Sequence, residues 1–168
     1  MSSILSLDIQ NNRLSANNTS FVGKLGEDLA ARFLSNNGFR LVLANFKVPI
    51  GRVRNDRQVS GEIDLIALEA DILCFVEVKT RSSDEFSSPL SAVNLRKQRQ
   101  ITRTARVYRK IFDLREIKFR YDVVSIVLQE NELPKIELFR NFWTESKFRK
   151  KFWNDDIFQR DYRKINYN

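Results

Sequence analysis

The chain has 168 residues, with 29 Lys or Arg against 21 Asp or Glu, which gives a formal net charge of +8. It has no histidine and one cysteine, which excludes an internal disulfide, a cysteine-based zinc cluster and imidazole catalysis or metal binding. A catalytic site must therefore use carboxylates, amines, guanidinium groups and oxygen-liganded metal, and the basic balance indicates a polyanionic partner.

Residues 1–19 are polar and rich in Asn and Ser, and we interpret them as a flexible tail. They lack a signal-peptide pattern, and no central apolar run approaches the length of a membrane span, so we expect a cytoplasmic protein with no membrane partner. A helix is predicted from about Val22 to Asn37, with Gly38 as its C-terminal stop. Glu27 lies off the apolar stripe of this helix.

A strand-like pattern follows from Phe39 to Val48. Pro, Gly and Asn then interrupt it from Pro49 to Ser60, which favours a mobile basic loop. Three arginines in this loop are candidate nucleic-acid contacts: Arg52, Arg54 and Arg57.

Two strands rich in Ile, Leu, Val and Phe come next, at Gly61–Leu68 and Ile72–Thr80. The second is apolar on both faces at its start, which is typical of a buried central strand, and Cys74 within it is interpreted as core. Both strands nevertheless carry charges. Buried charges are usually paired or bound to metal, so these strands are the leading candidates for a site.

A hairpin closed at Ala70-Asp71 would set Asp64 opposite Glu77, and Glu62 opposite Lys79, all on one face of the sheet. Carboxylates with Cβ atoms roughly 5 Å apart repel one another unless a cation lies between them. A divalent metal meets that need, and an amine on the same face suits phosphodiester chemistry.

The same charges also have structural interpretations. Glu62 and Lys79 could form a cross-strand ion pair, while Asp64 could accept backbone hydrogen bonds. The register stays open as well, because Ala-Asp is not a favoured two-residue turn and a three-residue loop would shift the pairing by one residue.

A long helix is predicted from about Leu90 to Phe112, with Pro89 in its first turn and Lys97 within its apolar face. A separate basic stripe has no acidic residue to pair with, so it favours a phosphate-facing surface over a merely solvated one. The stripe consists of Arg99, Arg103, Arg106 and Lys110.

Strands are predicted at Ile117–Leu128 and Lys135–Phe139, and the remaining chain to Asn168 mixes basic with aromatic residues. Three interpretations of these aromatics stay open: packing against the core, stacking on unpaired bases, or a dimer interface. Burial is expected for most of Phe142, Trp143, Phe148, Phe152 and Trp153.

Several motifs occur in order along the chain: Gly23-Lys-Leu-Gly-Glu27-Asp-Leu-Ala30, Gly61-Glu-Ile-Asp64-Leu-Ile-Ala67, Phe75-Val-Glu77-Val-Lys79-Thr-Arg81, Ala92-Val-Asn-Leu-Arg-Lys97-Gln98 and Tyr121-Asp-Val-Val124. Over about residues 21–128 the set resembles the YraN-like family of bacterial endonuclease-like proteins. Asp64 followed by Glu77-Val-Lys79 also matches the PD-(D/E)xK nuclease pattern. The family is similar to the Holliday-junction resolvases within the restriction-endonuclease-like fold.

The resemblance implies that the catalytic residues are Glu27, Asp64, Glu77 and Lys79. Asp64, Glu77 and Glu27 would hold Mg²⁺ or Mn²⁺, and Lys79 would orient the attacking water or stabilise charge. Nucleic-acid contacts are expected from the basic loop, the stripe and neighbours of the motifs: Arg52, Arg54, Arg57, Arg81, Lys97, Gln98, Arg99, Arg103, Arg106 and Lys110. The chain departs from the family in its basic loop, in the missing Gly at Ala70-Asp71 and in its extension after about residue 129.

We therefore predict an α/β fold with a restriction-endonuclease-like mixed central sheet flanked by helices, and a C-terminal aromatic and basic helical extension. Residues 1–19 would be a tail, 20–128 the nuclease-like domain, and 129–168 an extension packed on the domain or on a partner. The expected activity is Mg²⁺-dependent hydrolysis of DNA phosphodiester bonds, with branched DNA as the first candidate and a second copy of the chain as a further partner. A non-catalytic nucleic-acid-binding module and a protein-interaction domain using the aromatic extension are the alternatives.

Overall fold

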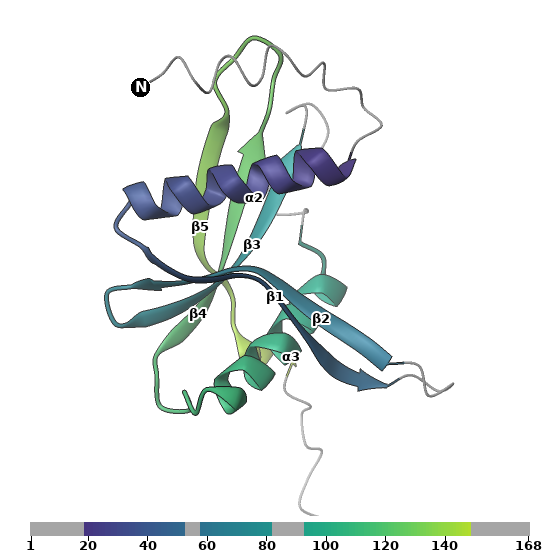
Figure 1. Cartoon of the computed structure of the whole chain (residues 1–168). Helices are drawn as coiled ribbons and strands as arrows, with labels where there is room; N and C mark the ends of the chain where they lie inside the picture. The colour runs from purple at the N-terminus through teal and green to yellow at the C-terminus, as the bar shows by residue number, and fades with distance from the viewer. Residues whose placement is uncertain (1–18, 53–57, 82–92, 149–168) are drawn as a thin grey trace, which may run out of the picture.

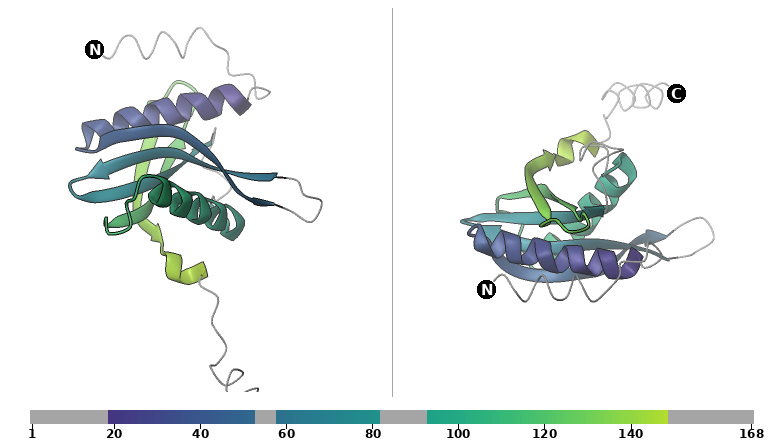
Figure 2. Two further views of the ribbon diagram at one scale, coloured as in Figure 1. Left: turned by 60° about the horizontal axis from the view of Figure 1, so that its bottom comes forward. Right: turned by 90° about the horizontal axis from the view of Figure 1, so that it is seen from above.

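The computed structural model describes residues 19–52, 58–81 and 93–148. These residues form a five-stranded sheet in the order β1-β2-β3-β4-β5, with helix α2 on one face and helix α3 on the other (Figure 1 and Figure 2). The elements are α2 (Thr19–Asn36), β1 (Arg40–Arg52), β2 (Gln58–Glu69), β3 (Ile72–Arg81), α3 (Leu95–Ile111), β4 (Phe119–Val127), β5 (Lys135–Trp143) and the short 3-10 helix η2 (Glu145–Phe148). Neighbouring strands are antiparallel except β3 and β4, which are parallel. The predicted α/β class, with a mixed sheet flanked by helices, is confirmed.

The central strand β3 is buried on both of its faces, as its apolar sequence predicts. Cys74 and Val76 pack in the cluster beneath α2, whereas Leu73 and Phe75 pack in the cluster beneath α3. Burial also raises the pKa of the Cys74 thiol to about 12, so this cysteine is a core residue rather than a nucleophile.

Helix α2 covers one face of the sheet through an apolar stripe that includes Ala30 and Leu34, both completely buried. A Cβ atom on Gly26 would lie 1.8 Å from Thr80 Oγ1, so the missing side chain lets the helix backbone approach β3 closely. The helix therefore crosses β3 near the C-terminal end of that strand, one residue beyond Lys79.

Helix α3 is shorter than predicted. Its N-cap is Asn94, whose side chain accepts a hydrogen bond from Lys97 N–H at 2.9 Å, and the first helical residue is Leu95 rather than Leu90. Asparagine competes well for this position because its side chain satisfies a free N–H of the first turn. Phe112, expected on the apolar face, is 52% exposed just after the helix ends.

The predicted mobile loop from Pro49 to Ser60 is largely a two-stranded ribbon. β1 continues to Arg52 and β2 already begins at Gln58, and the two pair with each other beyond the point where β2 leaves β3 (Figure 1). Pairing between strands supplies the backbone hydrogen bonds that a loop would lack, and Gln100 Nε2 of α3 donates to Ser60 O at 3.0 Å. The predicted contacts Arg54 and Arg57 lie outside the described residues.

The C-terminal extension begins with a strand, not with the predicted helix. β5 runs to Trp143 as the last strand of the sheet, and η2 follows it as a single short turn. Trp143 is 4% exposed, and Phe142 and Phe148 are partly buried against the cluster beneath α3. The remaining aromatics named above, Phe152 and Trp153, lie outside the described residues, as does the N-terminal tail.

Among the described residues, no helix combines the length and the apolar character that crossing a membrane requires.

Candidate functional site

The β2–β3 hairpin has the predicted register over its closed end. Pairing runs from Glu69–Ile72 to Leu65–Val76, and the two-residue turn is Ala70-Asp71, with Ala70 at a positive φ of 52°. The ladder ends at Leu65–Val76, one step before Asp64 and Glu77. Both carboxylates therefore lie where the two strands part.

Asp64 bridges the point of separation with its side chain. Its Oδ2 accepts a hydrogen bond from Val78 N–H at 2.7 Å, and the residue is only 9% exposed. Regular alternation fails here, because Ile63 packs beneath α3 whereas Leu65 packs beneath α2. The adjacent strand β1 is irregular at the same level, with Asn45 at a φ of 54°. One carboxylate oxygen is thus used by the backbone, as the structural interpretation expected.

Glu77 is the most deeply buried group of the site, at 1% exposure. Lys79 Nζ lies 3.0 Å from its Oε1, and Lys97 Nζ, from helix α3, lies 3.0 Å from its Oε2. The second ion pair lacks hydrogen-bond geometry, so Oε2 is buried without a hydrogen-bond partner among the described residues. The two lysines are partly exposed, at 34% and 29% of their side chains, and connect the buried carboxylate to the surface.

The predicted cross-strand pair between Glu62 and Lys79 is wrong. Glu62 pairs instead with Lys47 of β1, with Nζ and Oε1 3.0 Å apart. These two residues are direct partners in the β1–β2 ladder, while β2 no longer pairs with β3 at this level. Lys79 is therefore free of Glu62 and lies against Glu77.

Burial is the main electrostatic influence on the site. It raises the pKa of Asp64 to about 7, and the negative charge of Glu77 raises it further, against the opposing effects of the Val78 hydrogen bond and of Lys97. Burial works to lower the pKa of Lys97, but the carboxylates of Glu77 and Asp64 outweigh it and hold that pKa above its ordinary value. The pair of acids is thus costly to ionise, and the neighbouring cation compensates only in part.

The donor set suits a hard divalent cation. Mg²⁺ is commonly held by one or two carboxylates, with water and substrate phosphate completing its shell. Asp64 and Glu77 provide two carboxylates, and the buried Glu77 Oε2 lacks a hydrogen bond that a cation would replace. The described residues contain no group of three Asp, Glu, Cys or His placed to share an ion, so a role for Glu27 on α2 stays a prediction.

The basic stripe of α3 is exposed, as predicted, but it is not uniformly unpaired. Arg106 Nε lies 3.1 Å from Glu145 Oε2, whereas none of Arg99, Arg103 and Lys110 has an ion pair with a described residue. Glu145 comes from η2, far along the chain, so the acid-free sequence around the stripe gave no indication of it.

Of the two helix residues expected near the site, Lys97 reaches it and Gln98 does not. Gln98 is buried, donates from Nε2 to Val93 O at 2.7 Å and accepts at Oε1 from Lys147 Nζ at 3.2 Å. Its amide supports the start of α3. Arg81 is the last residue of β3 and is half-buried.

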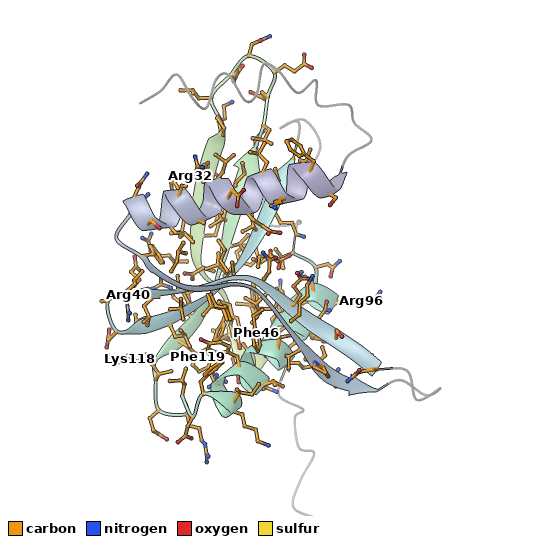
Figure 3. The ribbon with its side chains drawn as sticks, viewed as in Figure 1. Arg32, Arg40, Phe46, Arg96, Lys118 and Phe119 are labelled. Atoms are coloured by element: carbon orange, nitrogen blue, oxygen red, sulfur yellow. The ribbon has the colours of Figure 1, made fainter. Side chains whose placement is uncertain are left out.

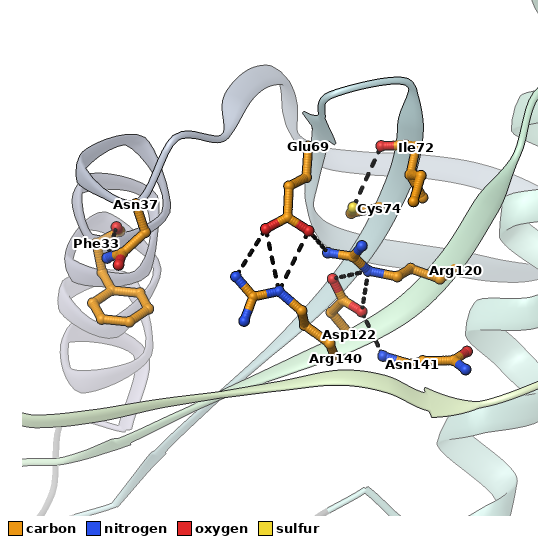
Figure 4. A network of polar contacts seen from close by, with 9 residues as sticks. All are labelled: Phe33, Asn37, Glu69, Ile72, Cys74, Arg120, Asp122, Arg140 and Asn141. Carbon is orange, nitrogen blue, oxygen red and sulfur yellow. Dashed lines mark hydrogen bonds and ion pairs between the residues drawn. The ribbon is translucent and has the colours of Figure 1, made fainter.

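The sequence reasoning also missed a second group of buried charges, drawn in Figure 4. Arg120 donates from Nε to both oxygens of Asp122 at 2.9 Å and from its terminal nitrogen to Glu69, which also accepts from Arg140. Asp122 further accepts from Asn141 N–H at 2.8 Å. We call Glu69, Arg120, Asp122 and Arg140 the arginine network. Among described residues it joins β2, β4 and β5, and no local sequence pattern indicates it.

Glu145 is a second residue that the sequence did not single out. Its Oε1 accepts from Tyr121 Oη at 2.8 Å and from Arg109 at 2.7 Å, in addition to the Arg106 contact. Trp143 Nε1 donates to Thr102 Oγ1 at 3.1 Å alongside it. These bonds fix the end of β5 and η2 against α3.

The chain is similar to a set of proteins that share one family description. The family model of "Uncharacterised protein family UPF0102" matches residues 26–126, a range that includes Asp64, Glu77, Lys79 and Lys97. A UPF0102 protein of Dictyoglomus turgidum is 42% identical over 111 residues, which are 66% of this chain and 86% of that protein. One of Acetivibrio thermocellus is 37% identical over 129 residues, 74% of this chain and 92% of that protein. One of Solibacter usitatus is 41% identical over 118 residues, 70% and 82% of the two chains. The resemblance to the YraN-like proteins is thereby confirmed, and the chain belongs to the UPF0102 family.

Proposed function

We propose that this protein is a metal-dependent nuclease that hydrolyses DNA phosphodiester bonds at the site formed by Asp64, Glu77 and Lys79. One observation carries the proposal: two buried carboxylates lie together where β2 leaves β3, and burial together with their mutual repulsion raises the pKa of Asp64 to about 7. A fold tolerates such a cost most readily when the groups serve a ligand. The alternation of apolar and charged residues at this point fits the PD-(D/E)xK pattern and a restriction-endonuclease-like fold.

Asp64 and Glu77 would hold Mg²⁺ or Mn²⁺, which when bound polarises a phosphoryl oxygen and makes a water molecule more acidic. The chain's own contribution is positional. The Val78 N–H orients the Asp64 carboxylate, and Glu77 holds Lys79 Nζ at 3.0 Å on the partly exposed side of the site. Lys79 would place its charge beside a phosphate oxygen in the transition state, where a fixed cation needs no reorganisation.

DNA is the substrate class that the charges favour. The chain carries a net charge of +8, and α3 has seven Lys or Arg and no acidic residue in Leu95–Ile111. Lysines and arginines that neutralise phosphates supply most sequence-independent DNA affinity. Branched DNA is the first candidate, by analogy with the resolvase-like nucleases.

A non-catalytic nucleic-acid-binding module is the second candidate, and one observation favours it. Lys79 and Lys97 already lie 3.0 Å from the two oxygens of Glu77, so an ammonium pair offsets the buried charge without any metal. Under this alternative the cluster is structural, and loss of a carboxylate changes stability but no activity.

A nuclease assay distinguishes the two. The full-length protein is incubated with duplex, single-stranded, flap and four-way DNA in the presence of Mg²⁺ or Mn²⁺, beside the variant Asp64→Asn and a matched control, Asp113→Asn. Asp113 is an exposed carboxylate outside the site, with 81% of its side chain accessible. We expect cleavage by the wild type and the control, and a loss on the order of a hundredfold or more in Asp64→Asn. DNA binding without cleavage in all three proteins would favour the binding module.

A further inference from the structure

A pocket of about 310 Å³ lies on the outer side of α3, away from the carboxylates. It is lined by Arg99, Thr102, Arg103 and Arg106 of the helix and by Phe148 of η2. Its volume is at the small end of the range for ligand sites, which suits a single nucleotide better than a double helix.

The pocket has more positive charge than the described residues neutralise. Arg106 uses Nε for Glu145, but Arg99 and Arg103 make no ion pair with any residue that the structure describes. Two guanidinium groups held near each other without a carboxylate repel one another, and an anion between them removes that repulsion. Arginine is also the side chain best suited to phosphate oxygens.

The opposite wall of the pocket is aromatic. Phe148 is partly buried against the core, and the guanidinium carbon of Arg99 lies 5.7 Å from the centre of its ring. An aromatic ring beside arginines is the combination that single-strand-binding proteins use, with a base on the ring and phosphates on the basic groups. Thr102 and Trp143 are hydrogen-bonded to each other beneath it, so this wall is firmly supported.

The pocket is on the far side of the helix from the carboxylate site. Each residue of an α-helix lies about 100° further round its axis, so Arg99, Arg103 and Arg106 lie about 180–240° from Lys97, which contacts Glu77. A helix with its side chains is roughly 10–12 Å across. A strand bound at Glu77 would therefore reach the pocket only by leaving a duplex and passing around α3.

We propose that this pocket binds one unpaired nucleotide of a single-stranded segment, with the base against Phe148 and the adjoining phosphate between Arg99 and Arg103. The inference rests on the proposed function in that its ligand is nucleic acid, and it specifies the substrate: DNA in which a single-stranded segment adjoins the cleaved position. Stacking is tolerant of base identity, so the pocket selects for an unpaired base rather than for a sequence.

The test measures binding by fluorescence anisotropy, with the full-length protein, EDTA, and either labelled oligo(dT) or a blunt duplex of equal length. Phe148→Leu keeps the apolar contact with the core but removes the ring. We expect it to weaken oligo(dT) binding about fivefold or more, to leave duplex binding and the salt slope unchanged, and to be rescued by Phe148→Trp. Arg99→Ala with Arg103→Ala should lower the log–log salt slope for oligo(dT) by about 1.4, since each lost phosphate contact contributes about 0.7.

The matched control is Arg32→Ala with Arg40→Ala, which removes the same charge from α2 and the start of β1 (Figure 3). It should keep the wild-type salt slope. The proposal fails if Phe148→Leu binds oligo(dT) like the wild type, if the two double variants behave alike, or if dTMP binds as tightly as oligo(dT). These readouts need no cleavage, so a failed pocket leaves the nuclease assay unaffected, and an inactive carboxylate site leaves this test intact.

Discussion

Asp64 with Glu77, which we call the carboxylate pair, and the arginine network both bury two acidic side chains on the same sheet. In the network every acid has geometrically sound partners: Arg120 binds Asp122 through both oxygens, and Glu69 accepts from Arg120 and Arg140. Hydrogen bonds from Arg140, together with Arg120, hold the pKa of Glu69 below its ordinary value. In the carboxylate pair, by contrast, Glu77 Oε2 lacks a hydrogen bond and the pKa of Asp64 is raised to about 7.

The difference separates a structural group of charges from a candidate functional one. Planar guanidinium forks satisfy carboxylates completely, whereas lysine ammonium groups act as point charges and leave the geometry open. The network lies among described residues of three strands that it ties together, while the carboxylate pair lies where two strands part. Burial alone does not distinguish the two, because Asp122 is as inaccessible as Glu77. What distinguishes them is whether the charge is satisfied.

The largest predicted effect is on the stability of the network. Burial raises the pKa of Asp122, and its hydrogen bonds with Asn141 and Arg120 offset part of that cost. Asp122→Asn keeps one acceptor but leaves Arg120, whose side chain is only 12% exposed, short of a partner. Breaking one half of a buried ion pair typically costs about 3 kcal/mol. Urea denaturation should therefore show a loss of that size.

The control for this loss is Glu132→Gln, since Glu132 is 56% exposed and its ion pair with Lys135 is long, at 3.9 Å. It should change the free energy of unfolding by less than about 0.5 kcal/mol. If Asp122→Asn were as stable as this control, the network would not be the structural element that its geometry indicates.

The opposite sign is expected for Asp64→Asn, which should stabilise the protein by about 2 kcal/mol at pH 8. The ordinary pKa of this carboxyl is 3.8 and its folded pKa is about 7. Between these values the unfolded chain releases the proton while the folded chain keeps it, so the contribution of Asp64 to stability falls as pH rises and is fully unfavourable above pH 7. Asn removes that penalty, although Lys97 loses part of its compensation.

The measurement is the difference in free energy of unfolding between wild type and Asp64→Asn at several pH values. It should be close to zero below about pH 4, where the carboxyl is protonated in both states, and should grow until about pH 7. A variant that is less stable than the wild type at pH 8 would place Asp64 with the satisfied acids of the network.

Divalent metal should distinguish the two groups by a smaller amount. A ligand that binds only the folded state at ten times its Kd stabilises it by about 1.4 kcal/mol, which raises the Tm by a few degrees. We expect Mg²⁺ in millimolar excess to raise the Tm of the wild type at pH 8 and to leave Asp64→Asn unchanged. A comparable shift in both proteins would mean that the ion binds elsewhere.

How far the sequence predicts these features depends on how local they are. The hairpin register followed from two apolar patterns and a two-residue turn, and Gly38, at a φ of 85°, follows the end of α2 as expected. The ribbon did not follow, because Pro49 and the glycines resemble loop residues until β1 and β2 are paired. Lys97 was indicated by its place in an apolar helix face.

The partners of the arginine network could not be predicted in this way. Glu69 and Arg140 are 71 positions apart in the chain and meet only because the sheet is built in one order. Glu145 is similar, since its contacts with Arg106 and Tyr121 depend on how β5 ends against α3. Contacts set by tertiary packing leave no periodic pattern in the sequence.

The smallest predicted effect concerns the turn that closes the hairpin between the two groups. Ala70 has a φ of 52°, a left-handed conformation that costs a residue with a Cβ roughly 1 kcal/mol, whereas glycine adopts it without strain. Ala70→Gly should therefore raise the free energy of unfolding by up to about 1 kcal/mol, less the extra entropy of glycine in the unfolded chain. Because Glu69 adjoins the turn, a more rigidly formed hairpin should favour the network, while the carboxylate pair, five residues away at the point of separation, keeps its metal response. Thermal unfolding with and without Mg²⁺ measures both quantities, and a variant that gains stability but loses the Mg²⁺ shift would show that the two ends of the hairpin are coupled.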